Sequence, residues 1–173
     1  DPRGAIYWPA EELLIVSDLN LAAEIGASRP EALLDAIKKV KVLKNFYSPS
    51  IIVCLGAGWP SQNSGKSLSS DEIRLLNDMI QNTKAWLWIT DNTDSQMPDN
   101  IKGDSLANFE LEGIHMLHYP KSFPLNEPTV CGQFYPKAKI DLSGYKVTGK
   151  VFVKSGNLLI MPAMNDFAGG MDI

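Results

Sequence analysis

The run Leu13–Asn20 (LLIVSDLN) constrains the fold of this chain more than any other segment. It is a short, continuous apolar run that stops at two polar side chains, Asp18 and Asn20. A continuous apolar run bounded by polar residues is typical of a strand that is buried on both faces. In open α/β sheets, functional residues follow the carboxyl ends of such strands. We therefore expect Asp18 to lie where several strand ends meet.

Three further apolar runs end at polar or glycine-containing corners, and helical patterns separate the early ones. The runs are 51–58 (IIVCLGAG), 86–94 (WLWITDNTD) and 129–136 (TVCGQFYP). A capping-box pattern with proline in the first turn, SRPE at 28–31, predicts a helix with a buried stripe of Leu33, Leu34, Ile37 and Val40. The sequence SSDE at 69–72 predicts a second helix, with a buried stripe of Ile73, Leu76, Met79 and Ile80.

From Phe109 onward the pattern changes to short strands alone. The strand-like segments are FELEG, IHMLH, TVCGQF, KAKIDL, KVFV and LLIMPA, and Ala5–Trp8 is expected to pair with Leu13–Ser17 as a hairpin. Strands that alternate with helices, followed by a run of strands, favour an α/β chain of the α+β type over a doubly wound parallel sheet. We expect two mixed sheets with helices on the outside, in a single domain that covers residues 1–173.

Composition places the chain among ordinary globular proteins. Of its 173 residues, 45% are hydrophobic and 21% are charged, which is typical of a globular domain with a sizeable core. The net charge of −4 argues against a broad nucleic-acid-binding face, although it leaves room for a local basic patch. No apolar run is long enough to span a bilayer, and no signal-peptide pattern opens the chain, so we expect a cytoplasmic protein without a membrane partner. The chain starts at Asp1 and not at Met, so we expect that native residues precede it.

Two cysteines and two basic features have ordinary explanations. Cys54 and Cys131 each lie within an apolar run, which predicts reduced core residues, with a disulfide between them as the less favoured alternative. The tripeptide GKS at 65–67 suggests a phosphate-binding P-loop, but the motif would then need glycine where the chain has Pro60. Four lysines gather on the first predicted helix, and a solvated face is favoured over a phosphate-binding surface: Lys38, Lys39, Lys41 and Lys44.

The order of the corners resembles the metal-ligand motifs of calcineurin-like metallophosphoesterases, which are Asp-x-His, Gly-Asp, Gly-Asn-His and late histidines. The resemblance is most specific to the subgroup of ligase-associated DNA-damage-response endonucleases. It runs from DPRGAIYWPAEELLIVSDLNL to the tail LLIMPAMNDFAGGMDI, which is similar to the subgroup's Leu-Pro-Ala-Phe…Gly-Gly ending. The resemblance implies a metallophosphoesterase-like two-sheet β-sandwich flanked by helices. It also implies descent from metal-dependent phosphoesterases, which are hydrolases that act in DNA repair.

Carried over residue by residue, the resemblance implies that most of the ligand set has changed. The retained residues, which would form a remnant catalytic and metal-binding site, are Asp18, Asn92 and His118, with Asp91 as an added carboxylate. The replaced positions, which would hold histidines or the bridging carboxylate in the family, are Asn20, Ala57, Thr93, Gln133 and Tyr135. A methyl group at Ala57 cannot bridge two divalent cations. We therefore expect either no metal or one weakly bound Mn²⁺ or Mg²⁺ ion.

Three functions follow from this pattern, and the sequence leaves all three open. The first is a degenerate metallophosphoesterase, a pseudoenzyme that retains the scaffold for binding. The second is an active phosphodiesterase or nuclease with a reduced, one-metal site, and the third is a cleft that binds a non-phosphate ligand. By analogy with the subgroup, the resemblance implies nucleic acid, a DNA ligase or a helicase as partners. His115 is expected to point away from His118 and receives no role.

Aromatic side chains lie in or beside the corners and have two readings. They would either stack on nucleic-acid bases or simply pack, and packing is the favoured reading. These side chains are Trp59, Tyr119, Phe134, Tyr135 and Phe167.

Overall fold

The computed structural model describes residues 1–21, 29–59, 68–90, 97–121, 125–166 and 170. Its first sheet has the order β1-β2-β3-β4-β5. The strands are β1 (Ile6–Trp8), β2 (Leu13–Ser17), β3 (Ile51–Leu55), β4 (Ala85–Ile89) and β5 (Asp104–Leu106). Strands β2 to β5 are parallel, while β1 pairs antiparallel with β2 across the short 3-10 helix η1 (Pro9–Glu11). The expected hairpin is therefore confirmed.

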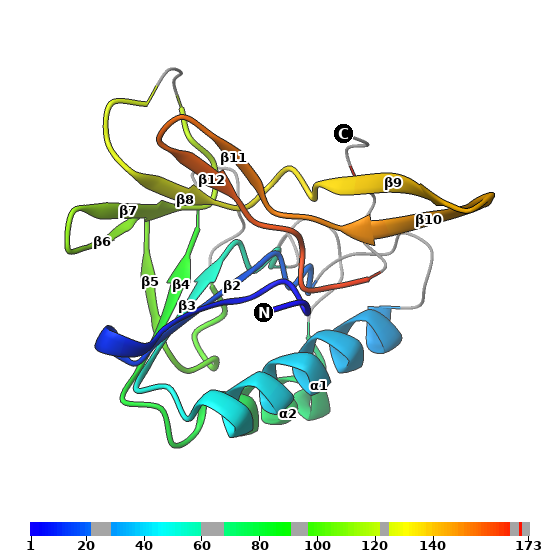
Figure 1. Cartoon of the computed structure of the whole chain (residues 1–173). Coiled ribbons are helices and arrows are strands. Elements are labelled where there is room, and N and C mark those ends of the chain that lie inside the picture. The colour runs from blue at the N-terminus through cyan, green and yellow to red at the C-terminus, as the bar shows by residue number, and fades with distance from the viewer. Residues whose placement is uncertain (22–28, 60–67, 91–96, 122–124, 167–169, 171–173) are drawn as a thin grey trace.

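The second sheet mixes parallel and antiparallel pairs in the order β11-β12-β8-β7-β6. Its strands are β6 (Phe109–Leu111), β7 (Ile114–Leu117), β8 (Thr129–Cys131), β11 (Val153–Ser155) and β12 (Leu158–Ile160). Two more strands, β9 (Lys137–Leu142) and β10 (Tyr145–Lys150), form a separate two-stranded ribbon that projects from the body of the molecule (Figure 1).

Two helices, α1 (Arg29–Tyr47) and α2 (Ser70–Ile80), lie side by side beneath the first sheet (Figure 1). The helix expected from SSDE at 69–72 begins with a capping box, in which the Ser69 hydroxyl accepts from the Glu72 amide and the Glu72 carboxylate accepts from the Ser69 amide. Ser28, the expected cap of α1, lies outside the described residues. No helix in the described part of the chain combines the length and the apolar character needed to cross a membrane.

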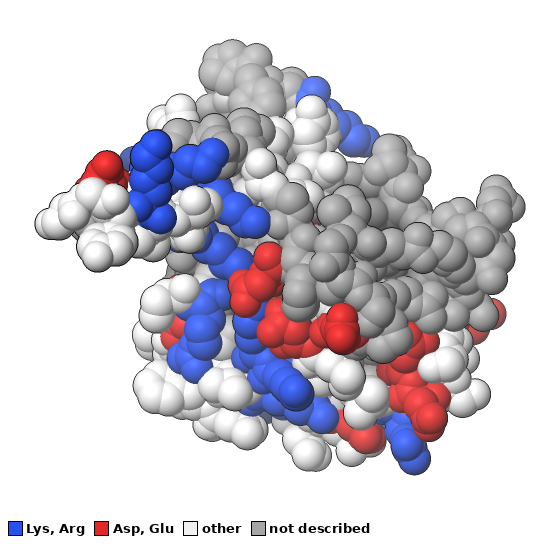
Figure 2. Space-filling view, turned by 90° about the vertical axis from the view of Figure 1, so that its right-hand side faces the viewer, with Lys and Arg blue, Asp and Glu red and all other residues white. Residues whose placement is uncertain are grey.

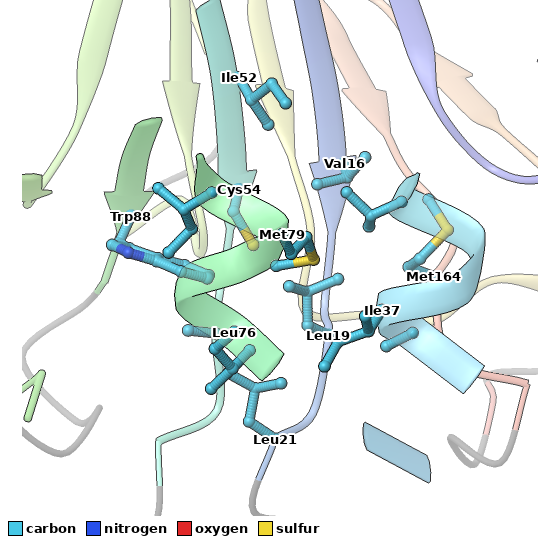
Figure 3. Packing of buried hydrophobic residues seen from close by; sticks show 14 of the residues in the cluster. Val16, Leu19, Leu21, Ile37, Ile52, Cys54, Leu76, Met79, Trp88 and Met164 are labelled. Atoms are coloured by element: carbon cyan, nitrogen blue, oxygen red, sulfur yellow. The ribbon is translucent and has the colours of Figure 1, made fainter. Parts of the chain in front are cut away.

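Alternation along the central strands divides the apolar core into two layers. Leu14 and Val16 of β2 face the helices, as do Ile52, Cys54 and Trp88 of the neighbouring strands (Figure 3). Leu13 and Ile15 point the other way, into a second layer that Met116 of β7 and Val130 of β8 complete. Side chains of a strand alternate between its faces, so a strand that is apolar throughout packs on both sides. The central sheet is thus covered by helices on one face and by the second sheet on the other.

The expected mixed α/β architecture with several multi-stranded sheets is confirmed. Both described helices cover the same face of the first sheet, whereas the sequence predicted helices on the outside without specifying a face. Two strands were missed. Strand β5 was not predicted; all three of its residues are exposed, and it lacks the apolar run by which the other parallel strands were identified. Strand β10 was also missed. The strand predicted at KVFV was misplaced, because this segment runs from the last residue of β10 to the first residue of β11.

Two predictions about α1 need correction. Leu34 is 39% exposed and does not belong to the buried stripe, which continues instead through Ala36 and Leu43. The lysines are also less uniformly solvated than expected. Lys39 pairs with Asp35 and Asp166, and Lys44 donates to the backbone carbonyls of Met79 and Gln81 at the end of α2. Burial and the neighbouring Lys41 lower the pKa of Lys44.

The stripe correction is testable with adjacent leucines. Leu33→Ala is expected to lower the free energy of unfolding by about 2–4 kcal/mol, because Leu33 is only 1% exposed and its loss leaves a cavity. Leu34→Ala, the matched control, is expected to cost less than about 1 kcal/mol. Urea denaturation measures both values. Equal losses would contradict the assigned orientation of α1.

Candidate functional site

Backbone hydrogen bonds join the carboxyl ends of neighbouring strands within each sheet. In the first sheet, the Asp18 amide donates to the Leu55 carbonyl and the Gly56 amide donates to the Ile89 carbonyl. In the second sheet, the Gly132 amide donates to the carbonyl of His118, the residue that follows β7. These bonds align the ends of β2, β3 and β4 in the first sheet and the ends of β7 and β8 in the second. The strand-end geometry expected from the sequence is therefore present.

Asp18 lies at the corner where these strand ends meet. Its side chain is 2% exposed, and both carboxylate oxygens have partners. Oδ1 is 2.9 Å from Nε2 of His118. Oδ2 accepts from the Gln133 amide at 2.9 Å and from the Ser17 hydroxyl. One carboxylate thus links the segments that follow β2, β7 and β8.

Two glycines make room for this arrangement. A Cβ atom added to Gly56, whose φ is +79°, would lie 2.3 Å from Nε2 of His118. A Cβ atom added to Gly132 would lie 2.2 Å from the Ser17 hydroxyl oxygen and 2.7 Å from Oδ2 of Asp18. Real Cβ atoms do not approach other atoms this closely. Both positions therefore need glycine for Asp18, Ser17 and His118 to meet.

The backbone of the corner is held in an unfavourable conformation. Asp18, Asn20, Gln133 and Tyr135 have φ values of 51°, 49°, 73° and 49°. The left-handed region costs a residue other than glycine about 1–2 kcal/mol, less for Asn and Asp. Such residues cluster at functional sites, where the surrounding structure enforces them. All four are positions that the family resemblance had identified.

The replaced positions fall into two groups in space. The Tyr135 hydroxyl donates to Oδ1 of Asn20 at 3.3 Å, so these two replacements contact each other. Gln133 contributes its amide to Asp18. Ala57 is different, because it is completely buried and belongs to the apolar layer beneath the helices. The methyl group of Ala57 is therefore part of the core.

Several predicted residues lie outside the described part of the chain, namely Asp91, Asn92, Thr93 and Phe167. Trp59 is described, and its ring packs against Trp88 with centroids 4.8 Å apart, which confirms the packing reading for this residue. The rings of Tyr119 and Phe134 lie 5.7 Å apart beside the corner.

Cys131 ends β8 beside Asp18. Burial and the Asp18 charge raise the pKa of its thiol to about 12, so the reactive thiolate is strongly disfavoured at neutral pH. Cys54, on β3 of the other sheet, is also buried, and no disulfide joins the two cysteines. The expected reduced state is confirmed, and the raised pKa leaves the Cys131 thiol without the character of a nucleophile.

The donor set is a poor match for a two-metal centre. Such a centre needs a bridging carboxylate, and the position implied for it carries the buried methyl group of Ala57. No group of three His, Cys, Asp or Glu side chains gathers among the described residues. The distance between Oδ1 of Asp18 and Nε2 of His118 suits either a direct hydrogen bond or two ligands of one metal ion. Two ligand atoms that each lie about 2.1 Å from an ion, at a right angle, are about 3.0 Å apart.

A pocket of about 490 Å³ adjoins the corner. Its lining mixes polar and apolar side chains, among them Thr90, Leu117, His118, Tyr119, Lys121 and Leu125. His115 also borders it, with Nε2 2.6 Å from the Glu127 carboxylate. His118 therefore connects the buried Asp18 carboxylate with a space of ligand size.

Two residues at the corner were missed from the sequence. Ser17 was counted only as part of an apolar strand, although a buried hydroxyl in such a strand needs a partner. The adjacent Asp18 could have identified that partner. No pattern in the sequence around position 132 could have shown that glycine is required there, because the requirement arises only from the contact between the two sheets.

Comparison of the chain with protein-family models, with curated proteins and with solved structures found no match.

The link between Asp18 and His118 can be measured by a double-mutant cycle. Asp18→Asn and His118→Gln are each expected to lower the free energy of unfolding by about 3 kcal/mol, because each leaves a buried polar partner unsatisfied. The double variant should cost about 1–3 kcal/mol less than the sum. Denaturant unfolding of the four proteins supplies the numbers. Additive losses would mean that the two side chains do not stabilise each other.

Proposed function

We propose that this chain is a metallophosphoesterase-like protein that has lost two-metal catalysis and retains the scaffold for binding a partner. In this account Asp18, a catalytic-site carboxylate by resemblance, now serves as a structural link between the two sheets. The protein would work in the cytoplasm, where reducing conditions keep Cys54 and Cys131 from forming a disulfide.

The observation that carries this proposal is that both oxygens of the Asp18 carboxylate already have protein partners. Its two oxygens accept bonds from the Gln133 amide and the Ser17 hydroxyl and contact the His118 imidazole. A carboxylate that binds metal must direct lone pairs at the ion, and here three of its about four lone-pair sites already face protein groups. The apolar surroundings of Ala57 add support, because a bridging carboxylate would have to be buried among hydrocarbon side chains.

The alternative is a phosphodiesterase or nuclease that works with one metal. The 2.9 Å separation of Asp18 and His118 supports it, because this distance also suits two ligands of one ion. Asn92, a ligand position by resemblance, and Asp91, an added carboxylate next to it in the sequence, would then supply further oxygen ligands. In such a site the residues of this chain would hold the ion, and the ion would activate water. The two accounts differ in turnover and in metal affinity.

The candidate partners of either form follow from the resemblance alone. They are nucleic acid, a DNA ligase and a helicase. The pocket beside His118 supports a further candidate, a non-phosphate ligand held by mixed polar and apolar side chains.

Turnover separates the two leading accounts. We expect hydrolysis of bis(p-nitrophenyl) phosphate or of DNA to stay at the level of a contaminant, with Mn²⁺, Mg²⁺ or Ni²⁺ present. Without a bridging carboxylate no hydroxide is held in line with phosphorus, and each 1.4 kcal/mol of lost stabilisation is about tenfold in rate. Any residual rate should be unchanged in Asp18→Asn. Robust metal-dependent turnover that disappears in Asp18→Asn would favour the one-metal enzyme.

Metal affinity gives an independent measure. Calorimetric titration with Mn²⁺ is expected to show at most one weak site, since Asp18 and His118 are the only strong ligands at the described corner. Two sites of micromolar affinity, about −8 kcal/mol each, would contradict the account. Asp18→Asn serves as the control for any heat that is observed.

A further inference from the structure

A polar pocket of about 540 Å³ lies between the last turns of α1 and the end of α2. Pro49, which lines it, precedes β3, and Asn82, which also lines it, precedes β4. Strands β2, β3 and β4 are parallel, so their amino ends lie at one end of the sheet and their carboxyl ends at the other. The pocket is therefore at the opposite end of the first sheet from Asp18.

One face of α1 forms a wall of this pocket. The side chains that line it from this helix and its end are Lys41, Lys44, Asn45 and Ser48. These positions follow one another at i, i+3, i+4 and i+7, which is the spacing of a single helix face. Asp78, Gln81 and Asn82 line the pocket from the last turn of α2 and the residues after it. All of these side chains are polar.

Several of the hydrogen-bond donors in the pocket have no partner within the described part of the chain. The ammonium group of Lys44 has three N–H bonds, and two of them donate to the carbonyls of Met79 and Gln81. The side chains of Lys41, Asn45 and Asn82 make no hydrogen bond or ion pair among the described residues. The wall thus retains donors that a ligand can use.

The two lysines of the pocket repel each other. Burial and the Lys41 charge lower the pKa of Lys44. Lys39 of the same helix pairs with two carboxylates, and Figure 2 shows a face of the molecule on which acidic side chains lie beside lysines. Asp78 lines the pocket but forms no ion pair with either lysine in the described structure. An anion bound beside both ammonium groups would offset their repulsion.

We propose that this pocket binds a phosphorylated sugar or polyol. Lys41 and Lys44 hold the phosphate, whose oxygens are strong acceptors for ammonium groups. The side-chain amides of Asn45 and Asn82 both donate and accept, as hydroxyl groups require, and the Asp78 carboxylate accepts from a hydroxyl. The volume is in the range of small-molecule sites. One ligand therefore uses both the charge and the neutral polar side chains.

The lining argues against other classes of anion. None of the described residues that line the pocket is aromatic, so it offers no stacking surface for a nucleobase. Pro49 and Met79 are its apolar members, which is little surface for an acyl chain. The phosphate-binding alternative that the sequence left open for the lysines of α1 is thereby confined to two of them. This inference goes beyond the proposed function and does not involve Asp18.

The test is calorimetric titration of the full chain with ribose 5-phosphate, at low salt and with EDTA present. We expect one saturable site that weakens as salt is added, because the lysines lie near the surface. Ribose should not bind, and inorganic phosphate, which lacks the hydroxyl groups, should bind at least about tenfold more weakly. No binding of ribose 5-phosphate at millimolar concentration, or equal binding of either control, would overturn the proposal.

Two lysines of α1 provide a matched pair of variants. Lys41→Met removes a charge from the pocket and should weaken the binding of ribose 5-phosphate at least about tenfold. Lys38→Met removes the same charge from the same helix, but Lys38 does not line the pocket, so the affinity should change less than about twofold. Equal weakening by both variants would mean general charge attraction and would refute the inference.

Side-chain amide signals locate the bound ligand. In proton–nitrogen correlation spectra, the Asn45 and Asn82 amides should shift with ribose 5-phosphate, whereas Asn108, which lines the pocket beside His118, should not. Shifts at Asn108 without shifts at Asn45 and Asn82 would refute the proposed site. EDTA removes divalent ions, so a phosphate held by metal at the Asp18 corner cannot produce the expected result. Failure here and failure of the proposed function are therefore distinguishable.

Discussion

The structure depends on one buried carboxylate that holds two sheets together. Asp18 follows a strand of the first sheet, while His118 and Gln133 follow strands of the second, and all three meet within hydrogen-bond distance. A charge that is almost completely buried is tolerated only when its partners replace water. The glycines at positions 56 and 132 and the left-handed backbone at Asp18 and Gln133 all follow from that requirement. The corner therefore has a structural role in the fold, whether or not it also binds a ligand.

The proposed account interprets this corner as a former metal site whose role has changed. The positions at which the family resemblance implies metal ligands include four residues held in the left-handed region, which is an arrangement typical of functional sites. The Tyr135 hydroxyl now contacts Asn20, and Ala57 packs among apolar side chains. In the proposed account, side chains that replaced ligands satisfy one another, so the strained backbone persists without the ion that it once served. The exposed ribbon follows directly after this corner, at Lys137.

Sequence reasoning worked where local chemistry and burial agree. The run Leu13–Ser17 predicted a strand buried on both sides, and the serine at position 69 predicted the start of α2. It failed where tertiary contacts decide. Leu34 has the spacing of a core residue but faces solvent, because the buried side of α1 is centred on Leu33, Ala36 and Val40. Strand β10 carries an alternating Tyr-Lys-Val-Thr pattern after a Ser-Gly turn, which could have predicted it. At the corner, Asp18 and His118 could be named from the resemblance. The hydrogen bond from Ser17 to Asp18 and the burial of Ala57 in the core depend on how the sheets pack, and could not be.

The most direct test of the central claim is anomalous diffraction at the manganese edge from crystals soaked in Mn²⁺. The account predicts that Oδ1 of Asp18 and Nε2 of His118 remain in contact at about the observed 2.9 Å, with no anomalous peak between them. A peak about 2.1–2.3 Å from both atoms would show that the pair is a ligand set. The link between the sheets would then be a metal site, and the structural role proposed for Asp18 would be wrong.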